Sequence, residues 1–422
     1  MVTFVSAALV AWAMSKPALA VEPFFTRMPK AEPAPEPAET GVEVAAEAGA
    51  TTNLVWVPGS TTKKEQLLGD IDKETGQPTR TRTFERFGVR GADLGQSFEH
   101  HGRVLFLFGD TIGEHGGDAI GWSTDRDPED GVDLSFFKRD DGLFLPFKPD
   151  GKPLAGFEVP VAGISIAGQP YIAYKSGRTK AVKDTEASSL ARFHERTGEA
   201  TTVREISRLP MGRLIKLSLH HEVGPKAGLP AGGPWIFQWG TAVYHASDVY
   251  MAVTPERTYA DTGDGTLYFS GMEAGLPTWS PRESAAVPVA ANGTLGDVSV
   301  TWAEEVGQWI MLYDNRVDRG VMFRHATHPW GPWSEEQQIF DPSEGGYGVF
   351  IHHPKSNDRL AGPVIGDENK DDPEAVKGGA YAPYVVERWT RVHRGQLRVY
   401  WLLSTWNPYV VVLMRSEFTI TP

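Results

Sequence analysis

Short apolar or alternating runs, each bounded by Gly, Pro, Asn or Asp, fill the chain from about residue 80 to its C-terminus. Such runs are typical of β-strands separated by turns. Helical periodicity is nearly absent, and even the segment 184–196 fits a strand followed by a turn at Thr197-Gly198-Glu199. The sequence predicts an all-β protein, with strands that include residues 104–108, 171–174, 235–239, 249–253, 298–302, 309–313, 321–325, 398–403 and 410–414.

The length of this β-rich region limits the architecture. Two sandwiches would need a linker near the middle of residues 80–422, and no such linker is visible. A five-bladed β-propeller would use roughly 65 to 70 residues per blade, which suits four-stranded blades with long loops. The segment VTWAEEVGQWIMLYDN, a strand, a polar turn and a strand, is the kind of unit that such a blade would repeat.

The N-terminal part of the chain has a different composition. Residues 2–14 are apolar and are followed by Ala18-Leu19-Ala20, a small-x-small pattern typical of signal cleavage. We therefore expect a signal peptide at 1–20, a Pro/Ala/Glu-rich linker at 21–52 and a lead-in at 53–79 before the propeller. Because no Lys or Arg precedes the apolar run, a short membrane anchor or a misplaced start is the alternative. The expected location is secreted, periplasmic or in the cell envelope, with no membrane span in the mature protein.

Composition excludes several function classes. A formal charge of −13 argues against nucleic acid as a partner. The absence of cysteine excludes disulfides, zinc thiolate sites and iron–sulfur clusters. We found no nucleophile elbow, phosphate loop, dinucleotide fingerprint or zinc-protease motif, so no cofactor or metal is expected. The 13 Trp and 12 Tyr residues suit stacking on carbohydrate, although many must be core residues. Nothing indicates an oligomeric state.

One acidic hairpin is the first candidate for chemistry. If residues 104–108 and 119–123 are paired strands, Asp110 and Asp118 lie at the same end of the hairpin, across the loop 111–117. Glycosidases need two such carboxyls, one to attack and one to donate a proton. We predict Asp110 as the nucleophile and Asp118 as the acid/base. The alternative is that both only cap the loop, because Asp is a favoured turn residue.

Asp125 is the second candidate for the acid/base. It lies past the other end of the hairpin, and seven strand residues span about 23 Å, so it can work with Asp110 only if the register differs. Its surroundings, Ser-Thr-Asp-Arg-Asp-Pro-Glu-Asp-Gly, could also suggest a cation site but lack calcium-loop spacing. We interpret this run as an Asx-rich turn.

Several elements, taken together, resemble the DUF4185 family, which is grouped with glycoside hydrolases that include endo-D-arabinanases. They are LFGDT, STDRDPEDG, SSLARFHERTGE, GTAVYHASDVYMAV, LGDVSVTW, WIMLYDN, HPWGPWS, GGYGVFIHHP and STWNPYVVVLMRSEF. The resemblance covers residues from about 80 to the C-terminus. It implies a five-bladed propeller and retaining hydrolysis of D-arabinofuranosidic bonds in a polysaccharide. The alternatives are a non-catalytic glycan-binding propeller and a hydrolase of the same fold that acts on another glycan.

The chain departs from the family pattern at three places. His245 stands where the family usually has Arg, Gly116-Gly117-Asp118 replaces an aromatic-Arg-Ser element, and Asp297 stands where the family has Glu. These departures bear on the choice of substrate. The candidate substrate-binding residues are Asp297, Tyr347, His352, Trp406, Asn407 and His245, and a role in the core or in a turn is the alternative for each.

Overall fold

The computed structural model describes residues 52–177, 186–224, 228–231, 233–315, 320–342, 347–348, 351, 379–406 and 408–422. All of them belong to one compact unit, residues 41–422. The predicted signal peptide and nearly all of the predicted linker lie outside the described residues.

Five antiparallel sheets form this unit. The first contains β3 (Val89–His100), β4 (Arg103–Gly113), β5 (Gly117–Ser123) and β6 (Ser135–Phe136). The second contains β7 (Pro160–Ile166), β8 (Gln169–Ser176), β9 (Ala187–His194) and β10 (Glu199–Arg208). The third contains β11 (Lys216–Glu222), β12 (Trp235–Thr241), β13 (Tyr250–Pro255), β14 (Leu267–Glu273) and β15 (Leu276–Ser280).

The last two sheets complete the set. The fourth contains β16 (Leu295–Ala303), β17 (Gln308–Asn315), β18 (Val321–Ala326) and β19 (Gln337–Phe340). The fifth contains β20 (Gly379–Val385), β22 (Gln396–Trp406), β23 (Val410–Thr421) and β1 (Asn53–Trp56), with β2 (Thr62–Gln66) on β23 and β21 (Arg391–His393) on β22.

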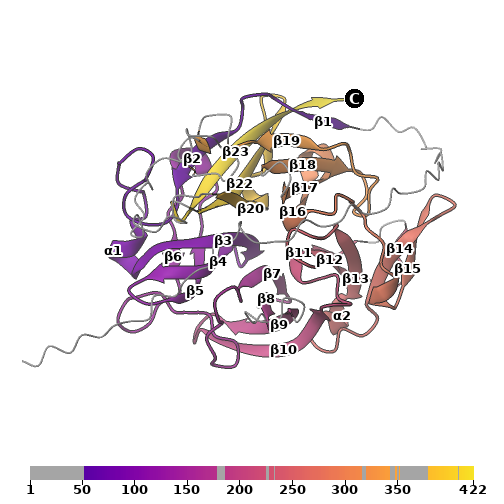
Figure 1. The fold of residues 1–422 in the computed structure, drawn as a ribbon, viewed down its shortest axis with the longest axis horizontal. Coiled ribbons are helices and arrows are strands. Elements are labelled where there is room, and N and C mark those ends of the chain that lie inside the picture. Colours follow the sequence, from indigo (N-terminus) through magenta and orange to yellow (C-terminus); the bar gives the residue numbers. More distant parts are fainter. Residues whose placement is uncertain are drawn as a thin grey trace, which may run out of the picture. The chain divides into compact units, whose positions relative to one another are not determined.

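The sheets are arranged as the blades of a ring (Figure 1). One edge strand of each sheet contacts the edge strands of the two neighbouring sheets, in the order β3, β7, β11, β16, β20 and back to β3. These five strands therefore surround a common axis. The prediction of an all-β, five-bladed β-propeller is confirmed.

Helices are short in the described part of the chain. They are α1 (Thr83–Phe87), α2 (Glu256–Tyr259) and the 3₁₀ turns η1 (Pro128–Asp130), η2 (Glu283–Ala285), η3 (Glu304–Val306) and η5 (Glu387–Trp389). Among the described residues, no helix has both the length and the apolar character that crossing a bilayer requires.

An apolar layer fills each space between neighbouring blades. β17 illustrates how the sequence builds these layers, because successive side chains of a strand point to opposite faces. Its Ile310 and Leu312 pack in the layer shared with the fifth sheet. Its Trp309, Met311 and Tyr313 pack in the layer shared with the third sheet. The strand is buried along its whole length, which explains its continuous apolar run.

The ring is closed by strands from the two ends of the described chain. β1 pairs with β23 from Asn53 opposite Thr421 to Trp56 opposite Phe418, and β2 pairs with the other half of β23. Figure 1 shows β1, in indigo, beside the yellow β23. The segment 53–79, expected as a lead-in, thus contributes two strands to the fifth blade.

This closure can be tested with adjacent residues of β1. Leu54 is fully buried between the fourth and fifth sheets, whereas the side chain of Val55 is 44% exposed. Leu54→Ala should lower the free energy of unfolding by about 2–5 kcal/mol, since it leaves a cavity in a shared layer. Val55→Ala is the matched control and should cost less than about 1 kcal/mol. Urea denaturation measures both, and a loss for Leu54→Ala no larger than that for Val55→Ala would show that the packing of β1 in the shared layer adds little to stability.

Candidate active site

The acidic hairpin has the register expected from the sequence. β4 pairs with β5 from Val104 opposite Ser123 to Phe108 opposite Ala119. Asp110 and Asp118 consequently lie at the same end, where the backbone N–H of Asp110 donates a hydrogen bond to Asp118 Oδ1 at 3.1 Å. The hairpin prediction is confirmed, and the two carboxyls are neighbours.

Several residues near Asp110 have irregular backbone. Asp110 lies in a β-bulge between Phe108 and Thr111 and has a φ of 39°, in the left-handed region that non-glycine residues avoid. Leu94, His245 and Ala382 also have positive φ values, of 63°, 56° and 53°. Bulges aim side chains away from the regular alternation, and strained residues cluster at functional sites.

Asp93 is a third carboxyl at this site, and it was not among the residues predicted from the sequence. It lies on the axial strand β3 opposite Gly109, the residue before Asp110. A Cβ at position 109 would lie 2.7 Å from Asp93 Oδ1, so glycine is required there for the carboxyl to fit. Tyr381 donates a hydrogen bond to Asp93 Oδ2 at 3.1 Å. Within the described part of the chain, Asp93 Oδ1 has no hydrogen-bond partner.

The environment of these carboxyls changes their pKa values. Burial, and then repulsion from Asp110, raises the pKa of Asp93 to about 7. Burial also raises the pKa of Asp110, but a hydrogen bond from Phe157 N–H and the charge of Lys175 oppose this change. The pKa of Asp118 is raised well above its usual range by burial and by the charge of Asp110. The three groups cannot all be ionised at neutral pH at low cost.

Asp297 forms a second acidic centre near the axis. Its Oδ1 accepts hydrogen bonds from Lys216 Nζ at 2.8 Å and from the Tyr384 hydroxyl at 3.0 Å. Lys216 also lies 3.6 Å from the centre of the Tyr244 ring. These contacts join β11, β16 and β20, so residues of three blades meet here. The charge of Lys216 offsets the cost of burying Asp297.

His245 is linked to Asp297 through Asp314. His245 Nε2 lies 2.6 Å from Asp314 Oδ2, and the other oxygen of Asp314 accepts the backbone N–H of Asp297 at 2.6 Å. The His245 ring stacks on Tyr244 with ring centres 3.9 Å apart. His245 therefore lies at the edge of the same cluster, and its role in binding substrate stays a prediction.

The residues of the site fall into a buried set and a half-buried set. Asp118, Lys216, Asp297, Asp314 and Tyr384 are buried. By contrast, the half-buried members keep part of their surface accessible: Asp93, Asp110, Tyr244, His245, Tyr381, Trp406 and Tyr409. A ligand would contact this second set. The two carboxyls can transfer a proton or attack an electrophilic carbon, and the phenol and indole rings can stack on a sugar.

The remaining candidates have different positions. Trp406 packs edge-on against Tyr409 with ring centres 5.4 Å apart, and Tyr409 donates a hydrogen bond to the backbone oxygen of Asp110 at 3.2 Å. Tyr347 is buried in the apolar layer between the fourth and fifth sheets, 4.9 Å from Lys63 Nζ. His352 and Asn407 lie outside the described residues.

Asp125 does not join the axial cluster. Its Oδ2 accepts hydrogen bonds from the Ser123 hydroxyl at 3.1 Å and from the backbone N–H of Asp133 at 2.6 Å. These contacts hold the turn that follows β5, at the end of the hairpin opposite Asp110. They agree with the interpretation of residues 123–131 as an Asx-rich turn.

The sequence held one signal for Asp93. It is a lone acid in Gly91-Ala92-Asp93-Leu94-Gly95, a run of small and apolar residues directly before the hairpin. Such an acid in a strand is unusual unless it is functional or paired. Lys216, Tyr381 and Tyr384 gave no such signal, because their neighbours in space come from other blades.

Similar proteins occur both among curated sequences and among solved structures, and three of them are described here. Notoamide biosynthesis cluster protein J from Aspergillus sp. (strain MF297-2) is 24% identical over 321 residues, covering 68% of this chain and 79% of that protein. The catalytic domain of the Coprinopsis cinerea GH62 α-L-arabinofuranosidase has a TM-score of 0.42 at 11% identity, covering 87% of this chain and 97% of that one.

The exo-β-1,3-galactanase of Phanerochaete chrysosporium has a TM-score of 0.42 at 10% identity, covering 86% of this chain and 64% of the galactanase, less than two thirds of its length. The profile of a family described as "Domain of unknown function (DUF4185)" matches residues 79–415. This match spans every blade of the propeller, and the chain belongs to the DUF4185 family.

Proposed function

We propose that the protein is an exported glycoside hydrolase that cleaves furanosidic linkages in a polysaccharide, with D-arabinan as the first candidate, by a retaining mechanism. The observation that carries this proposal is the pair Asp93 and Asp110. These two half-buried carboxyls lie on β3 and on its neighbour β4, and their environments act differently on their pKa values.

The environments suggest a role for each carboxyl. A pKa of about 7 leaves Asp93 partly protonated at neutral pH, as a general acid must be. Lys175 and the Phe157 N–H favour the ionised form of Asp110, as a nucleophile requires. Pairs of titratable groups whose environments separate their pKa values are typical of acid and nucleophile assignments. Asp93 therefore replaces Asp118 as our candidate acid/base.

The reaction then has two steps. In the first, an Asp110 oxygen attacks the anomeric carbon while Asp93 gives its proton to the departing glycosidic oxygen, whose bond to that carbon breaks. In the second, Asp93 removes a proton from water, and the resulting hydroxide displaces Asp110 from the sugar. Asp93 ends protonated and Asp110 ends ionised, so the pair is regenerated.

The separation of the two carboxyls decides whether the anomeric configuration is retained. Retaining enzymes separate the carboxyls by about 5–5.5 Å, whereas inverting enzymes need about 6.5–9.5 Å to admit a water. Asp93 Oδ1 lies close to Gly109, the residue before Asp110, and the charge of Asp110 raises the pKa of Asp93. We therefore assign the shorter separation to this pair.

Other residues would support this chemistry. Asp118 is 2% exposed and holds the Asp110 backbone in its strained conformation, so we assign it a positioning role. Tyr381 orients Asp93 and remains a phenol, because burial raises its pKa well above the usual range. Tyr244 and Trp406 are the aromatic surfaces available to a furanose ring.

Three asparagine variants test the assignment on purified D-arabinan. Asp93→Asn should lower kcat by about 10²–10⁴-fold, because an amide cannot donate the proton. Asp110→Asn should lose at least as much, because no covalent intermediate can form. Asp125→Asn is the matched control at the opposite end of the hairpin and should keep wild-type activity. Released oligosaccharides are quantified by chromatography, and NMR of the first product reports the anomeric configuration.

Each result has a defined meaning. Loss of activity only in Asp125→Asn would refute the axial pair, and an inverted product would refute the mechanism. Binding of D-arabinan by the wild type with no product would favour the glycan-binding alternative, and activity on another furanoside would change the substrate.

The pH dependence gives an independent prediction. The general acid must be protonated, so kcat/KM should fall as the pH rises through about 7, the pKa of Asp93. Activity should fall again at low pH, where Asp110 becomes protonated. The leaving group of an aryl furanoside needs no proton. With this substrate, the rate of the first step should not fall as the pH rises through about 7. A pH profile of the first step without that difference between substrates would exclude Asp93 as the acid.

A further inference from the structure

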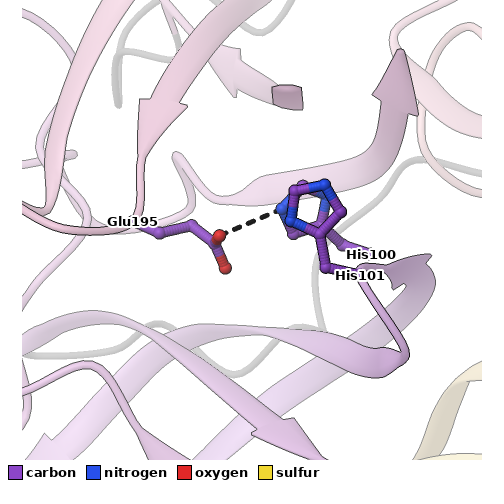
Figure 2. Close-up of side chains that lie close together, drawn as sticks. All are labelled: His100, His101 and Glu195. Carbon is purple, nitrogen blue, oxygen red and sulfur yellow. Dashed lines mark hydrogen bonds and ion pairs between the residues drawn. The ribbon is translucent and has the colours of Figure 1, made fainter. Parts of the chain in front are cut away.

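A second cluster of chemically active side chains lies at the other end of β3. His100 ends this strand, and Asp93 lies seven residues earlier, about 23 Å away along an extended strand. His101 follows in the turn to β4, and Glu195 lies in the turn between β9 and β10. Figure 2 shows Glu195 pointing at His100, with the His101 ring over the His100 ring.

The three side chains come together closely. One ligand atom from each lies within 4.8 Å of the others. His100 Nε2 lies 3.0 Å from Glu195 Oε2, and the two imidazole rings have centres 4.1 Å apart. We propose that His100, His101 and Glu195 form a binding site for a divalent transition-metal ion, with Zn²⁺ as the best fit.

The contacts of His100 prepare it as a ligand. Its Nδ1 lies 2.8 Å from the Ser165 hydroxyl, which leaves Nε2 directed at Glu195. Metal-binding histidines usually hold their second nitrogen in such a hydrogen bond, which fixes the tautomer and the ring orientation.

Glu195 is oriented in a comparable way. Arg103 contacts Oε1 of this carboxylate, so the other oxygen, Oε2, faces His100. Ligating carboxylates are commonly held by a partner of this kind. The positive charge of Arg103 also opposes a second cation nearby, so we expect moderate rather than tight affinity.

The ligand set selects the class of ion. Two imidazoles and one carboxylate form a three-ligand set known from zinc sites, where a water occupies the fourth position. Zinc–nitrogen bonds of about 2.0–2.1 Å place two ligand atoms of a tetrahedron about 3.4 Å apart. The separations here need only a small rotation of the exposed His101. Calcium and magnesium prefer six or more oxygen ligands and fit poorly.

A bound ion would join two blades. His100 and His101 belong to the first blade, as a strand end and a turn residue, whereas Glu195, in a turn, and Ser165, in β7, belong to the second. A Cβ at Gly168, in the turn from β7 to β8, would lie 3.0 Å from His101 Nε2, so this histidine already reaches the second blade. The ion would act as a clamp, and the inference does not depend on the proposed hydrolysis.

The test uses the full chain without a histidine tag, freed of metal by a chelator. Isothermal titration with zinc chloride should give one site per chain. His101→Ala should weaken binding by at least about 100-fold, and Ser165→Ala by about tenfold. His194→Ala is the matched control, because this exposed histidine adjoins Glu195 but lies outside the cluster. Calcium chloride should give no heat of binding at this site.

Thermal unfolding gives a second readout. Zinc should raise the Tm of the wild type and of His194→Ala, but not of His101→Ala or Glu195→Gln, because an ion that binds only the folded state stabilises it. The proposal is overturned if His101→Ala binds zinc as the wild type does, if His194→Ala loses equal affinity, or if the wild type binds no zinc.

Discussion

Pairing of the first described strands with the last one is the constraint on which the rest of the propeller depends. Each blade buries both of its faces against its neighbours. An open ring would expose the apolar faces of the blades at the opening, together with the unpaired edge of β23. β1 and β2 prevent this by pairing along β23, and Leu54 places an apolar side chain in the layer between the fourth and fifth sheets. This pairing ties the first described strands to the blade that the end of the chain forms.

Ring closure also forces charged groups together. Asp93, Lys216 and Asp297 lie on three different axial strands, and Asp110 and Asp118 lie one and two strands outward. Burial raises the pKa values of Asp93 and Asp118, so ionisation of either carboxyl lowers the free energy of unfolding. Lys216 and the tyrosine hydroxyls offset part of this cost. The apolar layers between the blades must supply the remainder.

Local features of the site could be predicted from the sequence, and features that join blades could not. The register of the hairpin around Asp110 and Asp118 followed from alternation and turn residues, which act over a few positions. The same register excluded Asp125 from the pair. Asp93 was missed because its approach to Asp110 depends on bulges between β3 and β4, which alternation does not reveal. Tyr347 has a glycine-rich sequence context but packs in a core layer, since tertiary contacts decide its burial.

The axial strand β3 contributes Asp93 to the candidate active site and His100 to the candidate metal site. Its two ends differ in backbone regularity. The end of β3 near Asp93 has bulges and a left-handed residue at Leu94, whereas the end near His100 keeps a regular register with β4 from Gln96 to His100. Irregular backbone aims side chains into a pocket but weakens the ladder. Regular pairing, reinforced by the contact of His100 with Glu195 of the next blade, resists movement of one blade against another. The two sites use different residues of β3. Strained backbone near Asp93 is therefore compatible with a rigid strand end near His100.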